Sequence, residues 1–160
     1  MFTVTQKYLA KLKAEFARLD PAVFDKGMWQ ICRALNKMPD IATSWCCSGH
    51  GEPESTETSD FYITMHASSE KGERSIANLY DWWCKFLGTQ VLTNEGMVDI
   101  HHTTVLELNR LRDQFEDGEV VYAYTFRAKV DNELNNSERH IVAFTKAAER
   151  LGFLDNRKTA

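Results

Sequence analysis

Hydrophobic side chains recur along the chain at two spacings, which distinguish segments expected to fold as helices from segments expected to fold as strands. In four segments the apolar positions follow the 3.6-residue period of an amphipathic helix. Thr5 is a candidate N-cap for the first of them, and Asp20-Pro21 has the order of an N-cap and a helix-starting proline for the second. The expected helices span residues 5–19, 21–38, 69–87 and 137–151.

Four other segments have the pattern of β-strands. Residues 41–47 form a short apolar run, and residues 61–66 alternate between apolar and polar side chains with the period of two that strands require. Residues 98–111 and 119–130 are expected to pair as an antiparallel hairpin. The order of these elements predicts an α+β fold: a mixed or antiparallel sheet of about four main strands, with four helices packed on it, in a single domain over residues 1–160.

Composition and charge narrow the class of protein. The 160 residues are 43% hydrophobic and 26% charged, which supplies enough apolar surface for a folded core. A net charge of -4 argues against a chain whose whole surface binds nucleic acid. Residues 1–4 lack the features of a signal peptide, and no stretch reaches the ~18 apolar residues of a membrane span. We therefore expect a cytoplasmic protein with reduced thiols and no membrane partner.

The densest group of candidate functional residues directly follows the expected strand 41–47. Glycines in the run Trp45-Cys46-Cys47-Ser48-Gly49-His50-Gly51 let backbone amides approach a ligand closely, and open sheets commonly bind ligands at the carboxyl ends of their strands. This pattern favours a cradle for a nucleotide-like, phosphate-bearing small molecule, and the alternative is an ordinary loop with a buried thiol. The residues assigned to ligand binding are Trp45, Cys47, Ser48, Gly49, His50, Tyr62 and Thr103.

Histidines on the polar faces of later strands are the candidate catalytic groups. His66 lies at the end of its strand, where pairing with a neighbour would bring it close to Cys47 or His50. His101 shares a face with Thr103, whereas His102 falls on the apolar face. His66 and His101 are therefore the expected catalytic residues, while His140, early in the last helix, is expected at the surface.

Three kinds of chemistry fit these residues, so whether the chain is an enzyme stays open. Zinc is the cofactor that Cys47-x-x-His50 would suit, with His66 or His101 as a further ligand. Alternatively, Cys47 would act as a nucleophile with a histidine as its base. The third alternative is phosphoester hydrolysis by paired histidines, because His66-Ala67-Ser68 and His101-His102-Thr103-Thr104 resemble the motifs of the two-histidine phosphoesterase superfamily.

Residues 48–60 suggest a different class of function. This glycine-, proline- and hydroxyl-rich stretch carries four carboxylates and no basic residue. A protein–protein inhibitor would use such charges to engage a basic partner, and the simpler interpretation is a solvated loop. The carboxylates belong to Glu52, Glu54, Glu57 and Asp60.

The run Thr43-Ser44-Trp45-Cys46-Cys47-Ser48-Gly49-His50, followed by Tyr62-Ile63-Thr64-Met65-His66, resembles small bacterial and bacteriophage proteins with a Cys-Ser-Gly-His turn after a strand. It is also distantly similar to the third family of wybutosine-synthesis tRNA methyltransferases, in which arginine stands in the place of His50. The resemblance implies a pocket around this turn that suits a nucleotide-like ligand. A phage origin would imply a counter-defence role, in which the protein sequesters or degrades a nucleotide signal.

Overall fold

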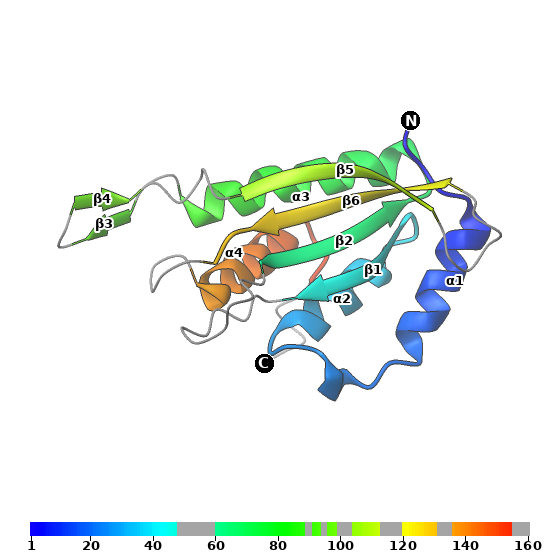
Figure 1. Cartoon of the computed structure of the whole chain (residues 1–160), viewed down its shortest axis with the longest axis horizontal. Coiled ribbons are helices and arrows are strands. Elements are labelled where there is room, and N and C mark those ends of the chain that lie inside the picture. Colours follow the sequence, from blue (N-terminus) through cyan, green and yellow to red (C-terminus); the bar gives the residue numbers. More distant parts are fainter. Residues whose placement is uncertain are drawn as a thin grey trace.

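The computed structural model describes residues 1–47, 60–88, 91–93, 96–98, 104–112, 120–130 and 136–154 (Figure 1). Its main sheet is fully antiparallel and has the strand order β1-β2-β6-β5. The strands are β1 (Ile41–Cys47), β2 (Phe61–Ala67), β5 (Thr104–Arg112) and β6 (Val120–Ala128). A separate two-stranded sheet consists of β3 (Val91–Thr93) and β4 (Gly96–Val98).

Helices pack on this sheet, which confirms the predicted α+β class. Their bounds are α1 (Gln6–Ala17), α2 (Met28–Asn36), α3 (Glu70–Leu87) and α4 (Ser137–Arg150). The caps follow the sequence: Thr5, Ser69 and Asn136 each accept a hydrogen bond from a backbone N–H in the first turn of α1, α3 and α4. None of the described helices is long and apolar enough to cross a membrane.

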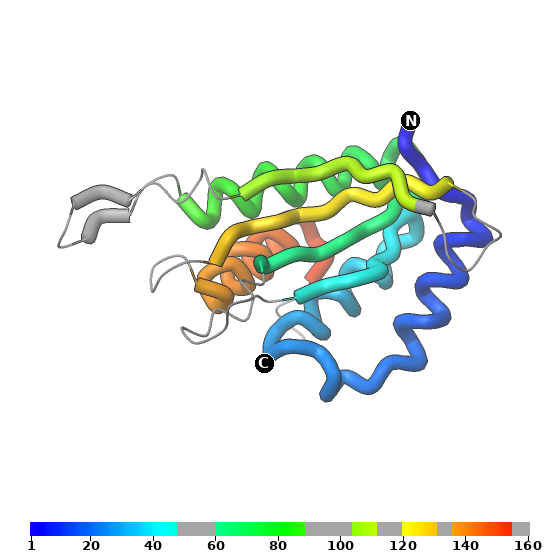
Figure 2. The backbone as a smooth tube through the Cα atoms, in the orientation of Figure 1, coloured from blue at the N-terminus to red at the C-terminus, as the bar shows by residue number. Residues whose placement is uncertain are grey.

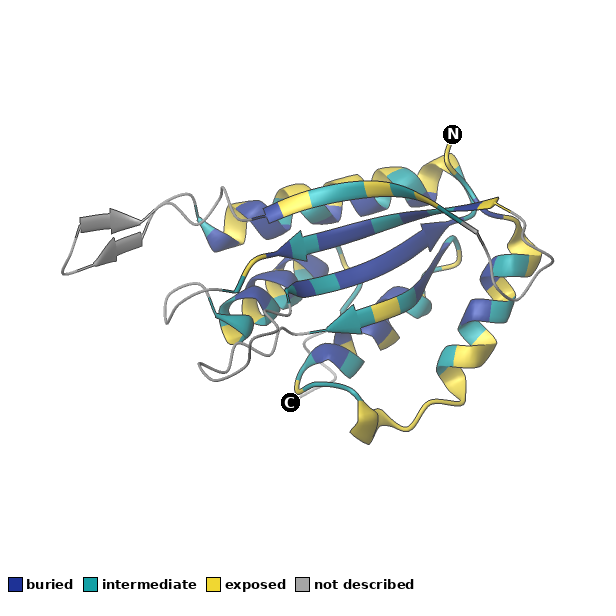
Figure 3. Cartoon of the chain, viewed as in Figure 1, coloured by how far each residue is buried: buried dark blue, intermediate teal, exposed yellow. Residues whose placement is uncertain are grey.

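The core lies on one face of the sheet, where α2, α3 and α4 cover it. Alternation along β2 places Phe61, Ile63 and Met65 on this face, each with no exposed surface (Figure 3). Trp83 of α3 stacks on Phe126 of β6 with ring centroids 5.5 Å apart and an interplanar angle of 13°. Side chains of α2, β1, β2, α3, β6 and α4 thus meet in one continuous apolar cluster.

Helix α1 packs at one end of the opposite face. Leu9 and Leu12 form a smaller apolar cluster with Val4 and with Ala42 and Val121, two strand residues that project from the sheet away from the main core. From α1 the chain turns through a short 3-10 helix, η1 (Pro21–Val23), and returns along α2, so that it bends around the outer edge of β1 (Figure 2). This bend creates the space that becomes the candidate site.

The prediction of one continuous second helix is wrong. Asp20 does act as an N-cap and accepts a hydrogen bond from the Ala22 N–H, but the helix it caps is only η1. The chain becomes extended at Phe24, and α2 begins after Gly27, whose φ of +84° lies in the left-handed region. A Cβ at Gly27 would lie 2.8 Å from Cγ2 of Ile141. The left-handed backbone at Gly27 interrupts the helix, and the close contact with α4 leaves no room for a Cβ at this position.

The prediction of a surface-exposed His140 is also wrong. Its side chain has no exposed surface and stacks on Phe61, with ring centroids 5.5 Å apart. His140 lies one helical turn before Ala143 and Phe144, on the stripe of α4 that faces the core. Phe61 and Trp83 pack against the flat imidazole of His140 as they would against another aromatic ring.

Candidate functional site

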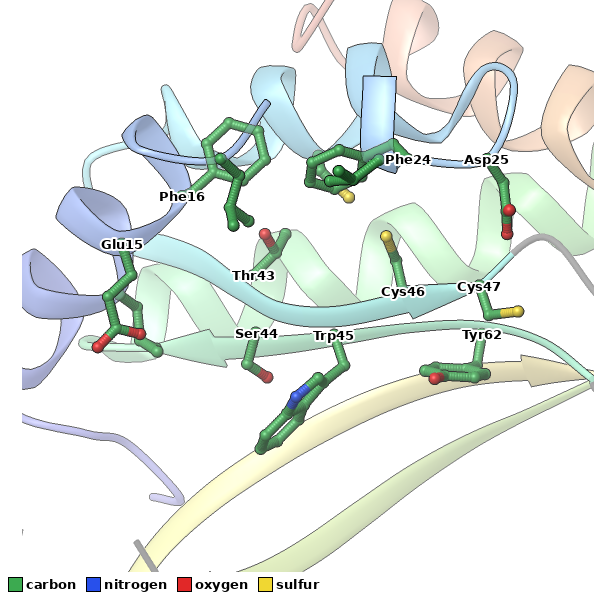
Figure 4. A pocket seen from close by; sticks show the side chains of 14 residues that line it. Glu15, Phe16, Phe24, Asp25, Thr43, Ser44, Trp45, Cys46, Cys47 and Tyr62 are labelled. Atoms are coloured by element: carbon green, nitrogen blue, oxygen red, sulfur yellow. The ribbon is translucent and has the colours of Figure 1, made fainter. Parts of the chain in front are cut away.

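A pocket of about 450 Å³ lies along the outer edge of β1, where α1 and the segment around η1 bend away from the sheet (Figure 4). Aromatic rings form much of its wall. Phe16 comes from α1, Phe24 follows η1, Trp45 lies on β1 and Tyr62 lies on β2. Phe16 and Phe24 also contact each other edge to face, with centroids 5.7 Å apart. The pocket therefore offers flat apolar surfaces from four separate elements.

A bulge in β1 determines on which side of the strand each side chain lies. The register with β2 shifts between Thr43 and Trp45, so Ser44 and Trp45 turn toward the same side of the strand. Figure 4 shows Thr43 and Cys46 pointing to the other side of β1, toward the helices. Trp45 remains 57% exposed, which leaves its indole ring free to stack on a bound group. The bulge thus places Ser44 and Trp45 on one side of this edge strand, and Thr43 and Cys46 on the other.

The carboxylates of Glu15 and Asp25 give the described wall of the pocket a negative character, because none of its described lining residues is lysine or arginine. Beside the pocket, the guanidinium of Arg127 lies 5.5 Å from the Tyr62 ring centre. Asp60 and Glu107 lie 3.6 and 3.4 Å from this guanidinium and compensate its charge. The described lining therefore favours neutral groups or hydrogen-bond donors on a ligand.

Three cysteines line the same pocket: Cys32 from α2, and Cys46 and Cys47 from β1. Cys32 is buried and Cys46 is half-buried. The hydrogen bond between their side chains, together with burial, raises the pKa of the Cys32 thiol well above its usual value, and the same bond lowers the pKa of Cys46. Next to these thiols, Asn36 links α2 to β1 by hydrogen bonds. Its side chain donates to Thr43 Oγ1 at 2.7 Å and accepts from the Thr43 N–H at 3.1 Å.

Tyr62 lies beside these thiols at the carboxyl end of β1, where it pairs with Cys47. Burial raises the pKa of its hydroxyl, and the neighbouring Cys47 and Cys46 thiols add to the effect. Tyr62 therefore keeps its proton at neutral pH and can donate a hydrogen bond to a ligand.

The structure brings together three of the predicted ligand-binding residues, namely Trp45, Cys47 and Tyr62, which all line the pocket. The other predicted site residues, Ser48, Gly49, His50, His101 and Thr103, lie outside the described residues. Sequence reasoning missed the contributions of Glu15, Phe16, Phe24 and Asp25. Their apolar and acidic character was visible, but nothing local indicates that α1 and η1 lie opposite β1.

His66 does not lie near Cys47, contrary to the expectation from sequence. Antiparallel pairing places it opposite Ala42, five residues (47 − 42) before Cys47, which corresponds to roughly 17 Å along the strand. Its Nδ1–H donates to the Tyr122 carbonyl at 2.9 Å, and Nε2 accepts from the Ser44 hydroxyl at 3.0 Å. With 1% of its surface exposed, His66 has the environment of a structural histidine.

The other chemistries expected from sequence depend on residues beyond the described part of the chain. Within residues 1–47, 60–88, 104–112, 120–130 and 136–154, no group of three or more histidine, cysteine or acidic side chains is placed to hold a metal ion. His50, the partner of Cys47 in the zinc hypothesis, lies outside these ranges. Of the four carboxylates in the acidic segment only Asp60 is described, and it forms an ion pair with Arg127.

Comparison with known proteins adds no relative: no family model, curated protein or solved structure matches this chain. The resemblances noted from the sequence therefore stay predictions.

Proposed function

We propose that this protein binds a nucleotide-like small molecule in the pocket along β1, with the base against Trp45 and Tyr62. The observation that carries the proposal is the combination of volume and lining. A pocket of about 450 Å³ lies within the range of roughly 300–1,000 Å³ typical of small-molecule sites. Aromatic rings suit a nucleobase because every base has a flat face on which they stack, and stacking contributes about 1–3 kcal/mol per base.

The carboxylates of the lining favour one class of base. Glu15 and Asp25 accept hydrogen bonds and cannot donate them when ionised. Exocyclic amino groups of adenine, guanine or cytosine are matching donors, whereas uracil and thymine lack them. We therefore expect a ligand with an amino-bearing base, and weaker binding of uridine or thymidine nucleotides.

Phosphate would be held next to Cys47, by the backbone amides of Ser48 to Gly51 that the sequence motif supplies. Binding without turnover is the simpler form of the proposal, since His66 is engaged on both ring nitrogens. A protein of this kind would act by sequestering a nucleotide, which is the counter-defence role that the resemblance implies. The four free cysteines fit the reducing cytoplasm proposed as its location.

A thermal-shift panel tests the proposal. Mono-, di- and cyclic nucleotides of all five bases are added to the reduced full-length chain. A ligand at 100 times its dissociation constant stabilises the fold by about 2.7 kcal/mol, which is a readily measured rise in melting temperature. We expect such a rise for at least one amino-bearing base. If none of the nucleotides raises the melting temperature, the proposed function is wrong.

The enzymatic alternative predicts a different outcome in the same samples. If the chain hydrolyses its ligand, chromatography of the incubated nucleotides will show product, and the product will disappear in His101→Ala. Intact nucleotide after prolonged incubation supports binding alone.

A further inference from the structure

Two thiols meet where α2 packs on β1, on the wall of the pocket. Cys32 lies in the middle of α2 and Cys46 near the end of β1, and both side chains line the same cavity. Cys46 is half-buried and points from β1 toward the helices (Figure 4). Cys32 is only 1% exposed, and it interacts with Cys46 closely enough to shift its pKa. A small reagent in the pocket therefore reaches the half-buried Cys46 more easily than the buried Cys32 on the same wall.

We propose that Cys46 and Cys32 form a peroxide-reactive thiol pair, in which Cys46 is oxidised first and Cys32 then closes a disulfide between β1 and α2. The co-reactant is a hydroperoxide small enough to enter the pocket, such as hydrogen peroxide. This inference concerns the thiols alone and holds whatever ligand the pocket binds.

Both steps balance without any further reagent. In the first, the Cys46 thiolate attacks one peroxide oxygen, the O–O bond breaks, and Cys46 sulfenic acid and hydroxide form. In the second, the Cys32 sulfur attacks the Cys46 sulfur, the S–O bond breaks, and the disulfide and hydroxide form; the protons of the two thiols convert both hydroxides to water. The sum is two thiols and one peroxide giving one disulfide and two waters.

The electrostatics of the pair assign the order of the two steps. The bond from Cys32 lowers the pKa of Cys46, and this effect exceeds those of burial and the Asp25 carboxylate, which act in the opposite direction. Cys46 is therefore the better nucleophile. The pKa of Cys32 is raised by its bond to Cys46, by burial and by the charge of Cys46. Oxidation of Cys46 removes that charge, so Cys32 becomes easier to ionise when it is needed.

The remaining two cysteines serve as controls. Cys84 is buried in α3, where its thiol lies 3.7 Å from Thr104 Oγ1, and it does not line the pocket. Cys47 lines the pocket but points to the opposite side of β1 from Cys46 (Figure 4). Cys84 should thus be slow to oxidise, and Cys47 should not pair with Cys32.

The test is peroxide oxidation of the reduced full-length chain, followed by alkylation of the remaining thiols and mass spectrometry. Trypsin gives three cysteine peptides: residues 27–33 with Cys32, residues 38–71 with both Cys46 and Cys47, and residues 75–85 with Cys84. Because Cys46 and Cys47 share a peptide, Cys47→Ser tells which of them forms the link. We expect monomer that has lost two hydrogens, with the first two peptides linked. Cys47→Ser and Cys84→Ser should still form the link. Cys32→Ser should stop at a Cys46 sulfenic acid, trapped by dimedone.

Three results would overturn the proposal: a link that contains Cys47 or Cys84, links only between chains, or oxidation of Cys84 at least as fast as Cys46. Melting curves of the reduced variants show whether each one folds. Should Cys32→Ser fail to fold, the peptide map of the wild type and of Cys47→Ser still decides between these outcomes. A negative nucleotide panel leaves this result unaffected, so the two proposals fail separately.

Discussion

Replacing Gly27 by alanine tests the account of the bend that forms the pocket wall. Gly27 separates η1 and the pocket residues Phe24 and Asp25 from α2. Its φ of +84° costs a residue with a Cβ about 1–2 kcal/mol. The new methyl group would also lie 2.8 Å from Ile141 Cγ2, and relieving such an overlap typically costs about 1–3 kcal/mol. We therefore expect Gly27→Ala to lower the free energy of unfolding by about 2–5 kcal/mol in total.

Gly152→Ala is the matched control. Gly152 has a similar φ of +78°, but no described atom lies within 4 Å of the position that its Cβ would occupy. Only the backbone cost of about 1–2 kcal/mol should remain. Urea unfolding followed by tryptophan fluorescence measures both variants, and Ile141→Ala provides the background in which the overlap is removed.

In that background, Gly27→Ala should destabilise the chain by no more than Gly152→Ala does. The reasoning fails if Gly27→Ala costs the same as Gly152→Ala with Ile141 present. It also fails if removing Ile141 leaves the cost of Gly27→Ala unchanged, because the contact with α4 would then have no energetic role.

Two further predictions concern buried or half-buried polar groups. The Tyr124 hydroxyl donates to Glu73 Oε1 at 2.8 Å, and burial, followed by this bond, raises the pKa of Tyr124 to about 12. The folded state therefore holds this proton more tightly than the unfolded chain, so the contribution to stability is complete below about pH 10 and is lost as the pH rises toward 12. Melting curves between pH 9 and 12 should show this loss, and it should be smaller in Tyr124→Phe; equal pH dependence would contradict the assignment. His66→Ala removes the partners of the Tyr122 carbonyl and the Ser44 hydroxyl, and should destabilise the fold by about 2–4 kcal/mol. His66→Ala should change nucleotide affinity by no more than about twofold, with the variant and the wild type both measured below their melting temperatures. A stable variant that no longer binds nucleotide would instead support a role of His66 in the site.

The fold was largely predictable because burial sets the period of the hydrophobic pattern. Strand β2 alternates without interruption, and its apolar residues are all in the core. The pattern misled where two elements shared one apolar period. Around Gly27, cap and stripe signals that belong to η1 and α2 were combined into one helix. His140 was wrongly expected at the surface because histidine is a polar residue, although its position falls on the buried stripe of α4.

The candidate site was predictable only where its residues are close in sequence or lie on paired strands. Trp45, Cys47 and Tyr62 were found because β1 and β2 are consecutive strands, with Cys47 opposite Tyr62 and Trp45 two residues before Cys47. The wall contributed by α1 and η1 was not predictable, since it depends on how the chain returns around the edge of β1. His66 was wrongly expected close to Cys47 because the register of an antiparallel pair cannot be read from the pattern of one strand.

The most direct measurement of the central claim is the dissociation constant of the nucleotide that stabilises the chain best, for the wild type and two tryptophan variants. Trp45→Ala removes the exposed ring of the pocket, and Trp29→Ala removes a ring of α2 that lies outside the pocket lining. Loss of stacking worth about 1–3 kcal/mol should weaken binding about 5- to 150-fold in Trp45→Ala. Trp29→Ala should bind like the wild type. Equal affinities for the wild type and Trp45→Ala would contradict the account.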